Sequence, residues 1–288
     1  MIIYNINDFI TKCLDIECDE GNILFYRGEN EKHDKLLPRV YQPQFNFIEN
    51  EDVIYKEALS MFPSEMLAQK TTIEKLILMQ HYGFPTRLLD ISKNPLIALF
   101  FACYTEQARN KEDTNGVVYI FSVPKKEIKF CDSDAVSIIA NLCKRSSSFS
   151  VSKIKANCKN ADEREEFNEN KEIQYLVDGI REEKPYFHNL VDYDDIISVK
   201  CLHPRMNNPR IIRQDGYFFV YGIDKDKKYP AIMNDKWILD TITISKDAKD
   251  PILEKLGLLN INETFVFPDY QHFNYALDKK YARQGNNT

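Results

Sequence analysis

The sequence has no excess of positive charge and no long apolar run, and each absence argues against a class of protein. Its 288 residues carry 38 basic and 44 acidic side chains, a net charge of -6, which gives no overall electrostatic reason to bind duplex DNA. The longest apolar run, from Pro95 to Tyr104, is about half the length of a membrane span. The first residues lack the basic region and cleavage site of a signal peptide. We therefore expect a soluble, cytoplasmic protein with no membrane partner and with nucleic acid disfavoured.

Paired cysteines and the common catalytic motifs are also missing. No two of the seven cysteines have CxxC spacing, so we interpret them as free thiols in a reducing compartment. The chain has no GxxxxGK[ST] loop, no GxGxxG, no HExxH and no GxSxG elbow. His188 and His203 stand too far from other ligands to suggest zinc, and we predict no metal.

The composition that remains is that of an ordinary globular protein, with 43% hydrophobic and 28% charged residues. Alternating patterns predict strands at 23–27, 117–123, 211–221 and 237–244. Helical patterns start at Asn50 and Thr71, run from Pro95 to about Gln107, and recur at 134–142 and 250–258. The sequence therefore predicts one α+β domain, in which a charged region at about 134–190 is a helical insertion or cover.

The most informative stretch runs from Gln80 to Asp90 (QHYGFPTRLLD) and is followed by an apolar segment at 94–102. After Pro85 the chain must be extended or irregular, and in a regular strand Thr86 and Asp90 would share one face while Arg87 would lie on the other. Polar groups against an apolar segment need a satisfied internal network or a ligand, because burying them unpaired is unfavourable. The stretch therefore locates a candidate site.

The helix before this stretch has clear ends. Thr71 and Glu74 have the spacing of a capping box, and Gly83 stands where a C-terminal glycine belongs. Gln80 continues the apolar stripe of this helix, so we predict that it points inward. His81 lies at the helix C-terminus, where the helix dipole favours the protonated form.

Three further segments place arginine or amide side chains beside apolar faces: 25–29, 38–39 and 210–214. Arginine presents a rigid fork of donors that suits phosphate or carboxylate and keeps its charge when buried. Gly28 would let a ligand or another backbone approach closely. Together these residues suit a bound diphosphate or nucleotide.

A structural interpretation stands beside the functional one. Arg27, Arg87 and Asp90 could form a buried ion pair or triad that holds strands together. Arg39 could pair with Glu57, and a single histidine at a helix end is most often a capping or core residue.

These motifs resemble the FRG-domain family, named for a Phe/Tyr-Arg-Gly motif that is here Tyr26-Arg27-Gly28. The likeness continues at 37–39, through the stretch from Gln80 to Asp90, and at 94–102, 210–218 and 267–269. It spans about residues 20–270, which implies that residues 1–288 are a single FRG domain. The chain departs from the usual pattern at Ile91-Ser92, where Trp-Thr is more common, and at Glu29, where Gln is common.

A weaker likeness is to the ADP-ribosyltransferase fold, which implies a mixed or antiparallel split sheet flanked by helices. In that fold Arg27 would be the first-strand residue that orients the cofactor, and Thr86 the second-strand hydroxyl. The helix would start at Pro95, and Gln214 would hold a position that is normally glutamate. An amide can bind a ribose but cannot usefully accept a proton or balance positive charge.

The resemblance implies NAD or a related nucleotide as substrate, an unknown macromolecular acceptor or water as its co-substrate, and a role such as toxin or antiphage effector. We assign catalysis to His81, Asp90 and Gln214, and cofactor binding to Arg27, Gly28, Thr86, Arg87 and Arg39.

Two other functions remain open from the sequence. The first is a non-catalytic module with a degenerate site that senses a ligand or binds a protein. The second is a binder of single-stranded nucleic acid that uses arginines with Tyr26 and Tyr82 as stacking partners, against which the acidic balance argues.

Overall fold

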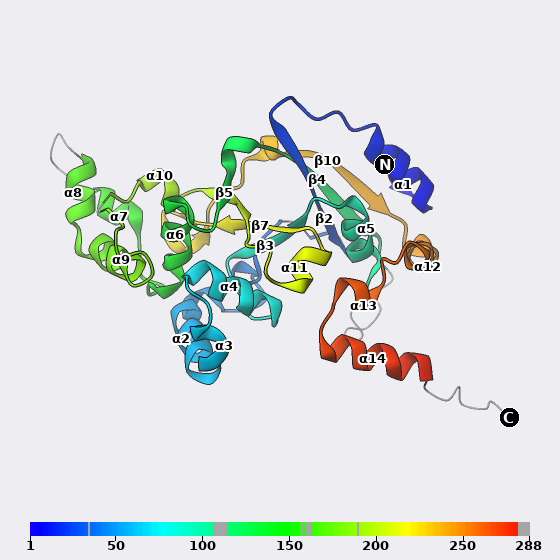
Figure 1. The fold of residues 1–288 in the computed structure, drawn as a ribbon. Helices are drawn as coiled ribbons and strands as arrows, with labels where there is room; N and C mark the ends of the chain where they lie inside the picture. The colour runs from blue at the N-terminus through cyan, green and yellow to red at the C-terminus, as the bar shows by residue number, and fades with distance from the viewer. Residues whose placement is uncertain (34, 106–113, 157, 159–162, 189, 282–288) are drawn as a thin grey trace.

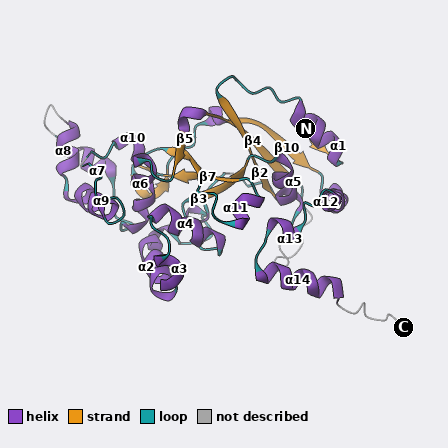
Figure 2. Cartoon of the chain, in the orientation of Figure 1, coloured by secondary structure: helices purple, strands orange, loops and turns teal. Residues whose placement is uncertain are grey.

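The computed structural model describes residues 1–33, 35–105, 114–156, 158, 163–188 and 190–281. Its main strands are β1 (Ile2–Ile3), β2 (Asn22–Glu29), β3 (Leu88–Ser92), β4 (Gly116–Pro124), β5 (Ile128–Phe130), β6 (Val199–His203), β7 (Gly216–Tyr221) and β10 (Ile238–Ile244). Within the described residues they form one open sheet in the order β1-β10-β4-β2-β3-β7-β6-β5 (Figures 1 and 2). The β1–β10 and β5–β6 pairs are parallel and the others antiparallel, so the sheet is mixed.

Helices pack on one face of this sheet, and a short hairpin of β8 (Ile223–Asp224) and β9 (Asp226–Pro230) lies apart from it. The helices are α1 (Ile6–Leu14), α2 (Glu51–Met61), α3 (Pro63–Leu67), α4 (Thr72–His81), α5 (Pro95–Cys103), α6 (Asp134–Asn141), α7 (Val151–Ala156), α8 (Glu163–Glu169), α9 (Lys171–Arg181), α10 (Tyr193–Ile196), α11 (Pro209–Arg213), α12 (Lys249–Leu258), α13 (Glu263–Val266) and α14 (Tyr270–Tyr281). The α+β class and the mixed sheet are thereby confirmed.

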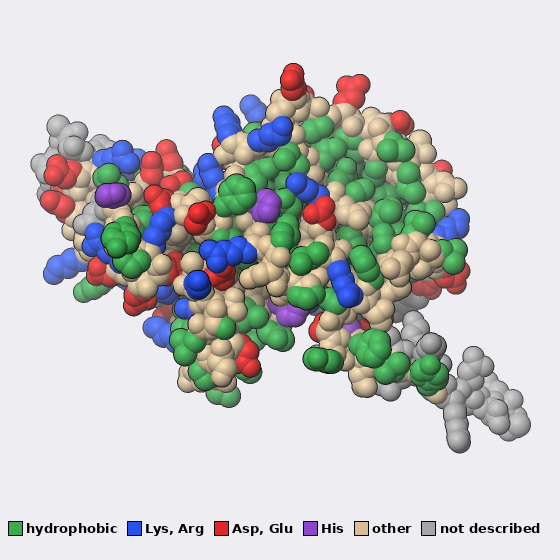
Figure 3. Space-filling model, viewed as in Figure 1, with side chains coloured by type: hydrophobic (Ala, Val, Ile, Leu, Met, Phe, Trp, Pro, Cys, Tyr) green, Lys and Arg blue, Asp and Glu red, His purple; other side chains and the backbone are tan. Residues whose placement is uncertain are grey.

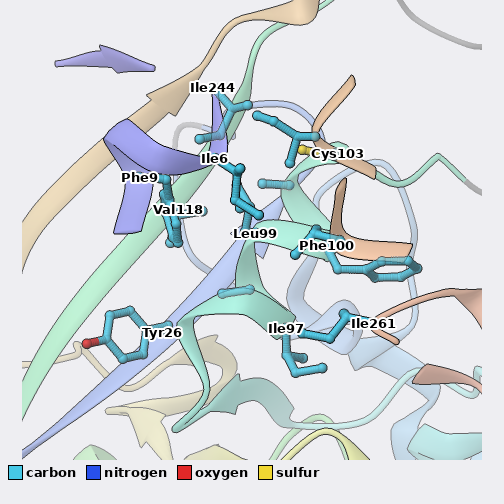
Figure 4. Packing of buried hydrophobic residues seen from close by; sticks show 14 of the residues in the cluster. Ile6, Phe9, Tyr26, Ile97, Leu99, Phe100, Cys103, Val118, Ile244 and Ile261 are labelled. Carbon is cyan, nitrogen blue, oxygen red and sulfur yellow. The ribbon is translucent and has the colours of Figure 1, made fainter. Parts of the chain in front are cut away.

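The central helix is α5, which packs on β2 and β4 together with α1 and α12 (Figure 4). Asn94 accepts a hydrogen bond from the N–H of Leu96 and Pro95 occupies the first turn, as the sequence predicts. Apolar residues on nearly all sides of α5 are buried, and Leu99 has no exposed surface. Burying one such side chain contributes about 1.5–3 kcal/mol, so α5 anchors this half of the sheet.

The other half of the sheet is covered on the same face by α4, α6 and α11. Leu88 of β3 packs there with Ile73 and Leu76 of α4 and with Val136 of α6. The capping box of α4 is confirmed, since Thr71 and Glu74 each bond the other's backbone N–H. Gly83 follows α4 with a φ of 77°, the left-handed conformation that ends helices.

In its described residues, the region predicted as a charged cover contains helices α6 to α9, which lie with α10 at one end of the molecule (Figure 1). These helices share an apolar cluster of their own, which includes Phe149, Phe167, Leu176 and Val177. Lys227 reaches from β9 to the backbone carbonyl of Arg145 and so connects this end to the body. Within the described residues, no helix has the length and apolar character needed to cross a membrane.

One predicted helix end and one predicted strand differ from the structure. The helix from Pro95 ends at Cys103, because Tyr104 is extended and its hydroxyl donates to Glu263; the predicted end at Gln107 lies outside the described residues. The predicted strand 211–221 is the short helix α11 followed by β7. Asn208 accepts from the N–H of Arg210 as an N-cap, which starts α11 before the strand.

Candidate functional site

The sheet is split between β2 and β3, and the split opens into a cleft. These two strands pair through a single residue pair, Tyr26 with Ser92, whereas β2 pairs with β4 along its whole length. The cleft has a volume of about 180 Å3. It is lined by Tyr26, Arg27, Gly28, Asp90, Ile91, Ser92, Ile97, Ala98, Phe101, Arg210 and Gln214.

Arg27 bridges the split where backbone pairing stops. Its Nη1 donates to the carbonyl of Asp90 at 2.8 Å, and its Nε donates to Glu29 Oε1 at 2.9 Å. The guanidinium therefore replaces a missing sheet hydrogen bond and is held from two sides. One-fifth of its side-chain surface is exposed, so part of the fork faces the cleft.

Gly28 is required by the close approach of α5. A Cβ on this residue would lie 1.8 Å from the carbonyl oxygen of Ala98, far inside any real contact. The sequence predicted that a ligand or another backbone approaches Gly28 closely, and in the structure the backbone of α5 does so.

Asp90 is held by a relay of polar side chains. Thr86 Oγ1 donates to Gln80 Oε1 at 2.6 Å, and Gln80 Nε2 donates to Asp90 Oδ2 at 2.7 Å. Thr86 has no exposed surface and is absent from the cleft lining, so it acts on Asp90 only through Gln80. Gln80 is half-buried and points inward as predicted, and Asp90 is the carboxylate exposed in the cleft.

The opposite wall comes from α11, whose residues are held by the C-terminal segment. Gln214 Nε2 donates to the carbonyl of Val266 at 3.0 Å, and the Arg210 guanidinium lies 4.9 Å from the ring centre of Phe267. Gln214 is the C-cap of α11 and not a strand residue, yet it lines the cleft. Arg210 was not among the predicted site residues, although Asn208-Pro209 carried the capping signal that places it on a helix.

His81 lies behind this wall and does not line the cleft. Its backbone carbonyl accepts from Arg210 Nη1 at 3.1 Å. The pKa of its imidazole lies below the ordinary value because burial disfavours the charged ring and the Arg210 charge repels it. At His81, burial and Arg210 therefore outweigh the helix dipole, which favours the protonated form.

Arg87 lies within the fold and not in the cleft. Its side chain has no exposed surface, and its Nε and Nη2 bind the two carboxylate oxygens of Glu51 at 3.0 and 2.5 Å. Lys227 Nζ lies 3.0 Å from the same carboxylate, and Arg87 Nη1 donates to the carbonyl of Tyr221. The structural alternative, a buried triad of Arg27, Arg87 and Asp90, does not form, because the carboxylate partner of Arg87 is Glu51.

Arg39 also lies outside the cleft. It donates to the carbonyl of Gly83 and packs near the rings of Phe45 and Phe47, while Glu57 is exposed on α2. The expected Arg39–Glu57 pair is absent from the ion pairs of the described residues.

Four predicted residues thus meet at the cleft, namely Arg27, Gly28, Asp90 and Gln214, while His81, Thr86, Arg87 and Arg39 do not. Glu51 could not have been found from the sequence, since an acidic residue in the first turn of a helix is common. In the part of the chain that the structure describes, no group of three or more His, Cys, Asp or Glu residues could hold a metal ion.

A comparison with protein families matches the FRG domain to residues 22–111. Neither the curated proteins nor the solved structures gave a match. The matched residues include β2, β3 and α5, and hence Arg27, Gly28 and Asp90, whereas α11 and the C-terminal segment lie outside them. The chain therefore contains an FRG domain at residues 22–111.

Proposed function

We propose that the cleft binds NAD or a related nucleotide and that the protein acts as an ADP-ribosyltransferase-like enzyme. Its reaction is transfer of ADP-ribose to a macromolecule or hydrolysis of NAD, in the role of a cytoplasmic toxin or antiphage effector. The observation that carries the proposal is the cleft at the split between β2 and β3, where two arginines face one carboxylate and one amide.

The charges of the cleft suit an anionic ligand that carries sugar hydroxyls. Arg27 and Arg210 come from opposite walls, and guanidinium groups bind phosphate through paired donors. The amide nitrogen of Gln214 donates to the carbonyl of Val266, so the amide oxygen can accept a hydrogen bond from a ligand hydroxyl. At about 180 Å3 the cleft is smaller than the roughly 300–1,000 Å3 of sites that enclose a drug-sized ligand. It therefore encloses one end of a dinucleotide and leaves the other end on the open surface.

Asp90 provides the chemistry that Gln214 lacks. Breaking the bond between ribose and nicotinamide leaves the bonding electron pair on nicotinamide and positive charge on the ribose. A fixed carboxylate stabilises that charge, and it accepts the proton of the water or acceptor hydroxyl that attacks the ribose. The hydrogen bond from Gln80 holds Asp90 in one orientation for both steps.

A second function, a ligand sensor without turnover, is favoured by one observation. The position that the resemblance assigns to glutamate is Gln214, which is tied to the backbone of the C-terminal segment. In a sensor, ligand binding would be transmitted through this tie and no bond would be broken.

The test combines thermal unfolding with NAD, ADP-ribose and nicotinamide and an assay for nicotinamide release. A ligand at 100 times its dissociation constant adds about 2.7 kcal/mol to the free energy of unfolding. The matched control is the Arg27→Gln, Glu29→Gln double variant, which removes the cleft charge without leaving Glu29 as an unpaired carboxylate. Stabilisation with release supports the enzyme, stabilisation without release supports the sensor, and no shift with any of the three ligands overturns both.

A further inference from the structure

The C-terminal helix α14 presents an exposed apolar stripe made of Tyr270, Phe273 and Leu277. Their spacing of three and four residues puts them on one face of the helix. Tyr270 is 94% exposed, Phe273 55% and Leu277 38%, so the exposure of the stripe is greatest at the start of the helix. Figure 3 shows hydrophobic side chains over α14, at the lower right of the view. We call these three residues the α14 stripe.

A largely apolar groove lies between α3 and α4. It has a volume of about 390 Å3, and its lining includes Phe62, Met66, Leu78, Tyr82 and Phe84. Tyr82 is 65% exposed and Phe62 46% exposed, so the groove is open to a partner. Grooves of this kind bind amphipathic helices through side chains at positions i, i+3 and i+7, which is the spacing of the α14 stripe. We call this surface the α3–α4 groove.

The groove and the helix begin close together on the molecule. Tyr82 is next to His81, whose carbonyl accepts from Arg210, and Arg210 lies against Phe267. Phe267 in turn stacks on His272 of α14, with ring centres 4.4 Å apart. From there α14 runs away from α3 and α4 (Figure 1), so the stripe does not fill the groove of its own chain.

We propose that two copies of the chain exchange their α14 helices, with each α14 stripe seated in the α3–α4 groove of the other copy. Because both surfaces start at the same place, one two-fold axis can satisfy both contacts, and a closed dimer results instead of an open fibre. A buried aromatic side chain covers roughly 150–250 Å2, so each contact buries on the order of 600–800 Å2 when both sides are counted. Two contacts then reach the roughly 1,200–2,000 Å2 of a stable interface. This dimer does not depend on the ligand proposed for the cleft.

Sedimentation velocity of the full chain over a range of concentrations tests the proposal. The wild type is expected to be a dimer. The helix variant Phe273→Glu, Leu277→Glu and the groove variant Phe62→Glu, Tyr82→Glu should each dimerise at least tenfold more weakly. The control is Leu258→Glu, a change on α12 at a residue that is 88% exposed and outside both surfaces, and it should dimerise like the wild type. Thermal unfolding of each variant checks that the fold is kept.

Mixing the two variants gives the decisive measurement. A mixture retains one intact contact, between the stripe of the groove variant and the groove of the helix variant, so it should form a mixed dimer more tightly than either variant forms its own. A monomeric wild type would overturn the proposal, whether α14 then binds its own groove or another protein. A dimer that survives both sets of changes would overturn it as well.

Discussion

Two arginines next to β3 have opposite environments. Arg87 has no exposed surface and shares the carboxylate of Glu51 with Lys227. Arg27 is one-fifth exposed, bridges the split in the sheet and faces the cleft. The same side chain thus stabilises the fold at one site and presents a charged fork at the other. The difference lies in the surroundings: Arg87 has all its polar neighbours inside the protein, whereas Arg27 meets a gap between strands.

The comparison predicts that removing the carboxylate beside Arg87 lowers the free energy of unfolding more than any other change considered below. In Glu51→Ala, two buried cations are left without a counter-charge, and breaking such a pair typically destabilises a protein by about 3–5 kcal/mol. Urea unfolding monitored by circular dichroism measures the change. Glu57→Ala, on the exposed side of the same helix, should stay within about 0.5 kcal/mol of the wild type. Equal effects of the two changes would show that the Arg87 cluster does not hold the fold.

The same carboxylate makes stability depend on pH. Burial alone would raise the pKa of Glu51, but Arg87 and Lys227 outweigh it and hold the pKa below its ordinary value of 4.5. The stabilisation that Glu51 provides is therefore fully present above pH 4.5 and is lost as the pH falls below it, through the pKa of the folded state. Unfolding measured from pH 7 to pH 3 should show the wild type losing more stability than Glu51→Ala. Parallel curves for the two proteins would contradict the lowered pKa.

Gly28→Ala, next to Arg27, is expected to lower the free energy of unfolding by a smaller amount. The new methyl group would meet the carbonyl of Ala98, a backbone atom that can move only with α5, and overpacking of this kind costs about 1–3 kcal/mol. Gly257→Ala is the matched control, since a Cβ there meets nothing within 4 Å. Because Gly257 lies in a helix, its replacement should raise stability by about 0.5–1 kcal/mol. A neutral Gly28→Ala would mean that α5 does not press on β2 as closely as the structure shows.

The two arginines also show how far sequence reasoning reaches. Local sequence motifs were enough to predict where helices begin. The capping box at Thr71 and the helix start at Asn94-Pro95 were predicted correctly. The partner of Arg87 is 36 residues away, and no periodicity reports which distant acid meets a given base. Asp90 and Gln214 were recognised as polar residues on apolar elements, but their positions depend on Gln80 and on the backbone of Val266. A sequence pattern identifies which polar side chains need a partner, but the identity of each partner depends on the tertiary fold.

Arg27→Gln should separate binding from folding. It leaves Glu29 with a nearly buried carboxylate and no cation, which should cost about 1–2 kcal/mol, less than the loss at Glu51. Adding Glu29→Gln should restore much of that stability without restoring the nucleotide-dependent thermal shift. The experiment is a thermal titration of the wild type and both variants with NAD. Binding that returns in the double variant would show that Arg27 serves the fold alone, as Arg87 does.

The smallest effect on stability, and the sharpest on chemistry, is expected for Asp90→Asn. Asp90 is exposed, and asparagine can still accept the hydrogen bond from Gln80, so stability should change by less than about 0.5 kcal/mol. If the carboxylate balances the ribose cation and takes a proton, nicotinamide release should fall about 100- to 10,000-fold while NAD still shifts the melting temperature. Asp235→Asn, at an exposed position outside the cleft, should leave both readouts unchanged. If Asp90→Asn releases nicotinamide as fast as the wild type, the cleft orients its ligand with Arg27 and Arg210 and without the carboxylate. The contrast between Arg87 and Arg27 would then be one between folding and ligand binding, and neither arginine would lie at a catalytic site.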